Sequence, residues 1–85
     1  MKEVRWNLLK SERLKRARGV SFEELIRSRL VAVKHHPSRT HQQIMLFEHK
    51  GYLWVVPFVE AGDEIFLKTL FPSRKYTQLY REGRL

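Results

Sequence analysis

The pattern of apolar and polar positions divides the chain into an N-terminal helical part and a longer part of strand-forming residues. Residues 8–18 predict a short basic helix with a thin apolar stripe. Asn7 is a suitable N-cap for this helix, and Gly19 suits the left-handed turn that ends it. A helix so rich in charge depends on packing rather than on intrinsic propensity for its stability.

The second helix has the clearest start signal in the sequence. Ser21 and Glu24 have the spacing of a capping box, in which each side chain satisfies a free backbone N–H near the other residue. Val20 and Leu25 stand at the two positions of a hydrophobic staple. We therefore expect a helix over residues 22–28.

The rest of the chain is typical of short strands separated by turns. Strands are expected over residues 30–33, 43–48, 52–59 and 64–71, with a candidate strand over residues 4–6 at the front and a terminal helix over residues 74–81. The pair Lys50-Gly51 predicts a tight hairpin turn. Pro57 cannot donate a ladder hydrogen bond, so we expect a sheet edge or a bulge there.

These elements predict a single α+β domain over residues 1–85. Consecutive hairpins imply an antiparallel sheet of about four strands, with two N-terminal helices and a short C-terminal helix on one face. The chain has no cysteine, which excludes a disulfide framework and thiolate metal sites. No apolar run is long enough to span a bilayer, and the first residues do not form a signal peptide. We therefore expect a cytoplasmic protein without a membrane segment.

Charge narrows the choice of partner. The formal net charge is +8, and residues 1–41 hold most of the excess, with eleven basic and four acidic side chains. Such an uneven cationic surface attracts polyanions, with nucleic acid as the first candidate and an acidic protein or an anionic membrane as the second. Lys10, Arg13 and Arg16 of the first helix are candidate residues for binding nucleic acid, which is RNA if the family resemblance described below holds.

A second cationic group lies around the end of the last predicted strand. Lys68 shares a strand face with Phe66 and Leu70 if side chains alternate, and Arg74 and Lys75 follow just beyond the strand. Three cations so close in sequence are suited to hold a phosphate and to stabilise charge that develops on it. Lys75 is assigned to RNA binding. An ordinary basic surface is the alternative interpretation.

Candidate acid–base residues are few. A neutral imidazole can exchange protons with ribose and phosphate oxygens, and His49 is the preferred candidate among the four histidines. The other three, His35, His36 and His41, lie in a polar loop without a nearby carboxylate or thiol, so no metal site is expected. Glu48 is a second candidate base, with an edge salt bridge as the alternative role.

Three segments stand out in order along the chain: Trp6-Asn7-x-x-Lys10, Arg18-Gly19-Val20-Ser21-Phe22-Glu23-Glu24, and Ile65-x-x-Lys68-x-x-x-Pro72-Ser73-Arg74-Lys75 followed by Tyr80. Together they resemble the BrnT branch of the RelE-type ribonuclease toxins. The resemblance implies a RelE-like fold, metal-independent cleavage of RNA without a cofactor, and a neutralising antitoxin that also binds DNA. It spans nearly the whole chain in order.

The resemblance implies the toxin of a type II toxin–antitoxin pair, an endoribonuclease that cuts mRNA and arrests growth. In this hypothesis Lys68 and Arg74 stabilise the phosphate in the transition state. His49 or Glu48 is the base, and Tyr80 is an acid or a base-stacking group. The expected partners are RNA and an antitoxin with an acidic contact segment, in a hetero-oligomer. The alternative is a non-catalytic module that binds nucleic acid or docks an antitoxin.

Overall fold

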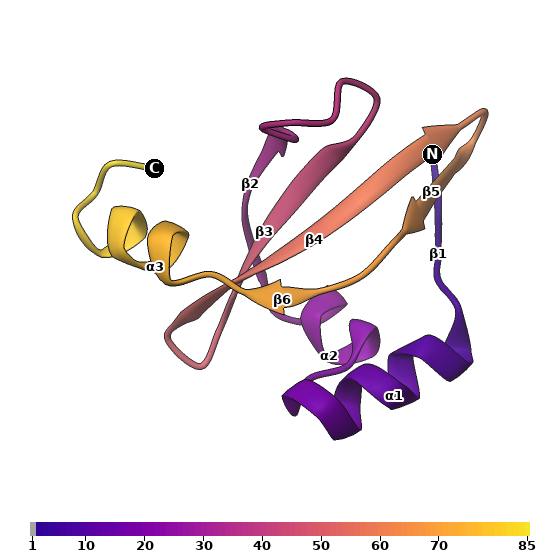
Figure 1. Ribbon diagram of the computed structural model, residues 1–85, viewed down its shortest axis with the longest axis horizontal. Coiled ribbons are helices and arrows are strands. Elements are labelled where there is room, and N and C mark those ends of the chain that lie inside the picture. The colour runs from indigo at the N-terminus through magenta and orange to yellow at the C-terminus, as the bar shows by residue number, and fades with distance from the viewer. Residues whose placement is uncertain (1) are drawn as a thin grey trace.

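The computed structural model describes residues 2–85 and consists of one mixed sheet with three helices (Figure 1). In chain order the elements are β1 (Glu3–Arg5), α1 (Leu8–Arg18), α2 (Phe22–Ile26), β2 (Arg29–His35), β3 (Gln43–His49), β4 (Tyr52–Ala61), β5 (Glu64–Leu67), β6 (Phe71–Pro72) and α3 (Arg74–Arg81). The strand order is β1-β5-β4-β3-β2, and β6 pairs with β4. The α+β class is confirmed. The expected four-stranded antiparallel sheet is wrong, because the sheet has six strands and β1 pairs with β5 in parallel.

The local start and stop signals are confirmed. The Asn7 side chain accepts a hydrogen bond from the N–H of Lys10 at 2.9 Å and caps α1, and Gly19 ends this helix with φ of 82°. Ser21 and Glu24 form the complete capping box of α2. α2 itself ends at Ile26 and is shorter than expected.

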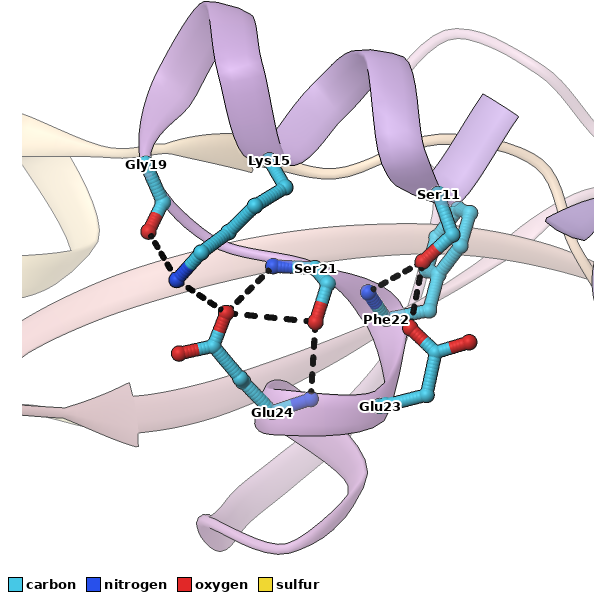
Figure 2. A network of polar contacts seen from close by, with 7 residues as sticks. All are labelled: Ser11, Lys15, Gly19, Ser21, Phe22, Glu23 and Glu24. Carbon is cyan, nitrogen blue, oxygen red and sulfur yellow. Dashed lines mark hydrogen bonds and ion pairs between the residues drawn. The ribbon is translucent and has the colours of Figure 1, made fainter. Parts of the chain in front are cut away.

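Side-chain hydrogen bonds hold α1 against α2 (Figure 2). The hydroxyl of Ser11, which is buried, donates to Glu23 Oε1 at 2.6 Å and accepts from the backbone N–H of Phe22 at 3.0 Å. The other carboxylate oxygen of Glu23 accepts from Trp6 Nε1 at 2.7 Å. The hydrogen bond from Ser11 is the main reason that the pKa of Glu23 lies below its ordinary value. The Glu23 carboxylate therefore joins the chain before α1, α1 itself and α2.

Replacing Ser21 with alanine is expected to lower the free energy of unfolding by about 1 kcal/mol. The Ser21 hydroxyl accepts from the backbone N–H of Glu24 at 3.2 Å, and alanine leaves that N–H without its cap. Denaturant unfolding followed by circular dichroism measures the change. Thr40→Ala, a hydroxyl deletion at an exposed loop position, is the control. Equal unfolding free energies for Ser21→Ala and wild type would contradict the role of the hydroxyl as a cap.

The ion pair between Lys15 and Glu24 predicts a loss of stability in acid. Its Nζ–Oε1 distance is 2.7 Å, and this hydrogen bond, followed by that from the Ser21 N–H, lowers the pKa of Glu24 from 4.5 to about 2. Because the lowered pKa favours the charged carboxylate in the folded state, the stabilisation is present above about pH 4.5 and is lost as the pH falls toward 2. The denaturation midpoint should fall less steeply over this range in Glu24→Gln, which keeps an acceptor for the Ser21 N–H without the charge. Equal slopes would contradict this linkage.

Helices cover both faces of the sheet, whereas we expected them on one face. α1 and α2 lie against the first face, called here the α1–α2 face, whose core is formed by Leu14, Val20, Phe22, Leu25, Phe47, Trp54, Val56, Phe58, Leu67 and Leu70. α3 lies against the other, called here the α3 face, whose core is formed by Ile44, Leu46, Leu53 and Val55, with Tyr76 and Tyr80 packed on it. Residues 53–58 of β4 are apolar and buried without interruption, so each face of this strand needs a cover.

The chain between β5 and β6 forms a bulge opposite Pro57. Both strands pair with β4, but the register shifts by one residue between them, so residues 56–57 face the three residues 68–70. The carbonyl of Pro57 accepts from the N–H of Lys68 at 2.8 Å, so the side of Pro57 that has no N–H faces the bulge. The edge or bulge expected at Pro57 is thus confirmed as a bulge.

The bulge changes which side chains share a face. The single strand expected over residues 64–71 is two strands, and Leu70 is fully buried in the core of the α1–α2 face. Lys68 is exposed, and its ammonium lies 5.7 Å from the centre of the Phe66 ring. The expectation that Lys68 shares a face with Phe66 is confirmed, but the expectation for Leu70 is wrong, because the extra residue inverts the alternation.

The end of α1 fixes the bulge in place. Arg18 Nη1 donates to the backbone carbonyl of Leu70 at 2.5 Å. This carbonyl lies outside the strands, so the guanidinium supplies a partner that the sheet does not. Arg18 is exposed and nevertheless makes a structural contact.

Candidate functional site

Lys68 opens onto a hollow of about 330 Å³ at the bulge. The main lining residues, which define what we call the Lys68 hollow, are His36, Arg39, Gln42, Pro57, Lys68 and Phe71. Pro57 follows Val55 by two residues in β4, and Phe71 is the cross-strand partner of Val55, so both share the α3 face with Val55. The hollow therefore lies on that face, beyond the part that α3 covers. No Asp or Glu among residues 2–85 lines it. The hollow therefore presents positive charge and one aromatic ring.

Arg74 and Lys75 lie outside the Lys68 hollow. They begin α3, which Ser73 caps by accepting from the N–H of Tyr76 at 3.0 Å, and they line a separate hollow of about 400 Å³ with Gln78. Lys75 Nζ lies 5.8 Å from the centre of the Tyr76 ring. The three cations predicted as one cluster are therefore divided between two hollows, because α3 turns Arg74 and Lys75 away from the bulge.

Glu48 and Tyr80 meet on the α3 face. The Tyr80 hydroxyl donates to Glu48 Oε1 at 3.2 Å, and both side chains are half-buried. Thr77 holds α3 there, because its Oγ1 accepts from the N–H of Leu53 at 2.8 Å. Thr77 is buried, with 2% of its surface exposed. A carboxylate hydrogen-bonded to a phenol can share and move a proton. The structure thus pairs two residues that the sequence analysis named separately.

The Glu48–Tyr80 pair stands apart from the Lys68 hollow. Glu48 lies four residues along β3 from Ile44, which is the partner of Pro57. At about 3.3 Å per residue, the pair is about 13 Å along the strand from the hollow. One phosphate cannot contact both Lys68 and Glu48 at that separation.

His49 projects from the opposite face of the sheet. It follows Glu48 directly in β3, and neighbouring strand residues point to opposite faces. It therefore lies on the α1–α2 side, where Tyr52 is its cross-strand partner beside the hairpin turn. The structure does not bring His49 together with Glu48, Tyr80 or Lys68.

The first helix presents a cationic ridge. Arg13 and Arg16 are exposed and line a shallow hollow of about 390 Å³, and Lys10 is half-buried. Leu8 and Leu9 at the start of α1 are 68% and 69% exposed. The ridge therefore combines charge with unburied apolar surface.

His36 is the residue that the sequence analysis undervalued. Its position in the sequence indicates only a histidine in a polar loop. In the structure His36 is half-buried and lines the Lys68 hollow. The signal that could have found it is the polar loop between two strands, since such loops converge on a sheet end where functional side chains gather. Within residues 2–85 no group of three or more His, Cys, Asp and Glu could hold a metal ion. In the same range, no helix is both long enough and apolar enough to cross a membrane.

The fold has a counterpart among solved structures. The ribonuclease toxin BrnT of Brucella abortus superposes with a TM-score of 0.57 at 14% sequence identity, and the match covers 86% of this chain and 97% of that chain. The chain has a BrnT-like fold. No protein-family model matches the sequence, and no curated protein matches it either.

In this BrnT-like fold, each of the three segments that carry the sequence resemblance supplies a helix cap. Asn7 caps α1, Ser21 caps α2 and Ser73 caps α3. The residues that carry the resemblance therefore serve largely to start the three helices. Lys68, in the third segment, is the residue that also reaches the hollow on the open part of the sheet.

Proposed function

We propose that this protein is the RNA-cleaving toxin of a toxin–antitoxin pair, of the RelE-type class. The observation that carries the proposal is the BrnT-like fold over 86% of the chain, with an exposed lysine in a cationic hollow on the open sheet face. The net charge of +8 supports a polyanionic substrate. The proposed substrate is mRNA.

Cleavage in this proposal proceeds by attack of a ribose 2′-oxygen on the adjacent phosphorus, with loss of the 5′-oxygen. Water accepts the proton of the 2′-hydroxyl and donates one to the leaving 5′-oxygen. Lys68 stabilises the negative charge that grows on the phosphate oxygens, since its ammonium is held beside the Phe66 ring at the hollow. Glu48 and Tyr80 meet a neighbouring nucleotide, because they stand too far along β3 to touch the same phosphate.

The proposed antitoxin contacts the first helix through an acidic segment. Arg13 and Arg16 offer charge to such a segment, and exposed Leu8 and Leu9 offer apolar surface beside it. The antitoxin also binds DNA, and the toxin–antitoxin hetero-oligomer resides in the cytoplasm. Lys75, Arg74 and Lys10 extend the RNA-binding surface.

A non-catalytic RNA-binding or antitoxin-docking protein is the second candidate function. The observation in its favour is the separation of Lys68 from the Glu48–Tyr80 pair and from His49. A protein with this surface could hold RNA through its cations without cutting it.

Induced expression in a bacterial host tests the first candidate. Growth is expected to stop and full-length mRNA to decline, and co-expression of the antitoxin restores both. Purified protein is expected to cut RNA equally well with and without a chelator. Normal growth despite abundant folded protein, together with intact RNA in the purified assay, would rule out the toxin. RNA binding without cleavage would favour the second candidate.

A further inference from the structure

The Lys68 hollow contains an imidazole whose tautomer is fixed by the loop around it. His36 Nδ1 accepts hydrogen bonds from the backbone N–H of Ser38 at 3.1 Å and of Arg39 at 3.2 Å. A nitrogen that accepts from two N–H groups carries no proton of its own, so the proton of the neutral ring is on Nε2. The neutral ring of His36, which lines the hollow, therefore carries an N–H donor at Nε2 rather than a proton acceptor.

Cations lie beside this donor. Lys68 and Arg39 line the same hollow, and no carboxylate among residues 2–85 lines it to neutralise them. The Lys68 ammonium lies 5.7 Å from the centre of the Phe66 ring, within the range of a cation–π contact. An ammonium, a guanidinium and an imidazole N–H together match the oxygens of a phosphate group.

An aromatic ring lies in the same hollow. Phe71 is 36% exposed in β6, a short strand held to β4 by pairing with Val55. A partly exposed ring on a fixed strand offers a surface on which an unpaired base can stack. Bases inside a duplex are already stacked on their neighbours, so this arrangement favours a single strand.

We propose that the Lys68 hollow binds one nucleotide of single-stranded RNA, with the phosphate held by Lys68, Arg39 and His36 Nε2–H and the base stacked on Phe71. The choice of RNA rests on the proposed function. His36 is a binding and orienting donor in this site, and its Nδ1 is committed to the loop.

Two substitutions of His36 separate its two roles. In His36→Asn the side-chain Oδ1 takes the place of Nδ1 and accepts from the same loop N–H groups, as in an Asx turn, while the Nε2–H donor is lost. His36→Ala removes both. The probe is a fluorescently labelled single-stranded RNA with 2′-O-methyl groups, which the proposed reaction cannot cut. Its dissociation constant is measured by anisotropy.

His36→Asn is expected to weaken binding about tenfold, as for one lost hydrogen bond to a charged group. The matched control is His41→Asn, an exposed histidine of the same loop that does not line the hollow, and it is expected to bind as wild type does. Circular dichroism of each variant serves as the check that it is folded. Wild-type affinity in His36→Asn, with weak binding in His36→Ala alone, would show that the ring only shapes the loop and would overturn the donor role.

The phosphate and base contacts have separate signatures. Lys68→Gln is expected to reduce the slope of log K against log salt by about 0.7, as for one phosphate contact on a single strand. Phe71→Leu is expected to weaken binding about tenfold with an unchanged slope, because stacking carries no counterion release. Arg27→Gln, an exposed cation at the end of α2, is the control for general charge.

The outcomes distinguish this site from the proposed function. Wild-type binding in the His36→Asn, Lys68→Gln and Phe71→Leu variants, with RNA cleaved by the wild-type protein, would overturn the hollow as a nucleotide site and leave the ribonuclease function standing. Tighter binding of single-stranded DNA than of RNA of the same sequence would overturn the assignment of RNA. Loss of affinity in the three variants would support the site even if the protein binds RNA without cutting it.

Discussion

Replacing Lys68 with alanine is expected to lower the single-turnover rate of RNA cleavage about a hundredfold, in line with the loss of one charge-stabilising donor. The ammonium lies at the hollow beside the Phe66 ring, and alanine removes its positive charge from the side of the phosphate. The assay uses a saturating excess of protein over labelled RNA, which isolates the chemical step from binding. The result depends on the proposed ribonuclease function.

Arg74→Ala is the informative comparison in the same assay. Arg74 lines the other hollow, on the outer side of α3, so its loss is expected to weaken RNA binding with little change in turnover. The sequence alone predicted equal effects for Arg74 and Lys68. Wild-type turnover in Lys68→Ala, or a larger loss in Arg74→Ala, would move the catalytic centre away from the bulge.

Replacing Ser11 with alanine is expected to lower the free energy of unfolding by about 2 kcal/mol. Ser11 is 2% exposed, so alanine leaves the N–H of Phe22 buried without a partner and removes a donor from Glu23. The loss should be about twice that of Ser21→Ala. Ser21→Ala leaves the N–H of the half-buried Glu24 without its cap, whereas Ser11→Ala affects the N–H of the fully buried Phe22. Denaturant unfolding gives both values under the same conditions.

Cleavage per folded molecule should be unchanged in Ser11→Ala, because Ser11 lies between α1 and α2 on the face opposite the Lys68 hollow. An unfolding free energy equal to that of wild type would contradict the buried hydrogen bond. Loss of cleavage with stability retained would place Ser11 in the active site instead.

The sequence predicted those features that depend on a few adjacent residues. The capping box of Ser21 and Glu24 and the hairpin turn at Lys50-Gly51 need only local geometry, and Lys50 and Gly51 have φ of 53° and 81° as such a turn requires. Pro57 predicted a bulge because its missing N–H is a property of the residue itself.

The missed features depend on contacts between distant segments. The inverted positions of Lys68 and Leu70 follow from the bulge, which exists because Pro57 of another strand faces that stretch. The second helical layer was missed although residues 53–58 carry its signal, an apolar run without alternation. For the candidate site, the sequence context singled out Lys68, which the structure places at the hollow. It did not reveal the tautomer of His36, because the tautomer depends on the conformation of the following loop.

The hydrogen bond between Arg18 and Leu70 also bears on how the protein is made. It joins residues that are 52 apart, and β1 likewise pairs with β5 near the other end of the chain. During translation α1 and α2 leave the ribosome before their partners in β4, β5 and the bulge. The packing of α1 and α2 against the sheet must therefore wait until β4, β5 and the bulge have been synthesised, because contacts between segments far apart in sequence form late. The Lys68 hollow, which the bulge creates, is among the last parts to form, so an unfinished chain carries no working site.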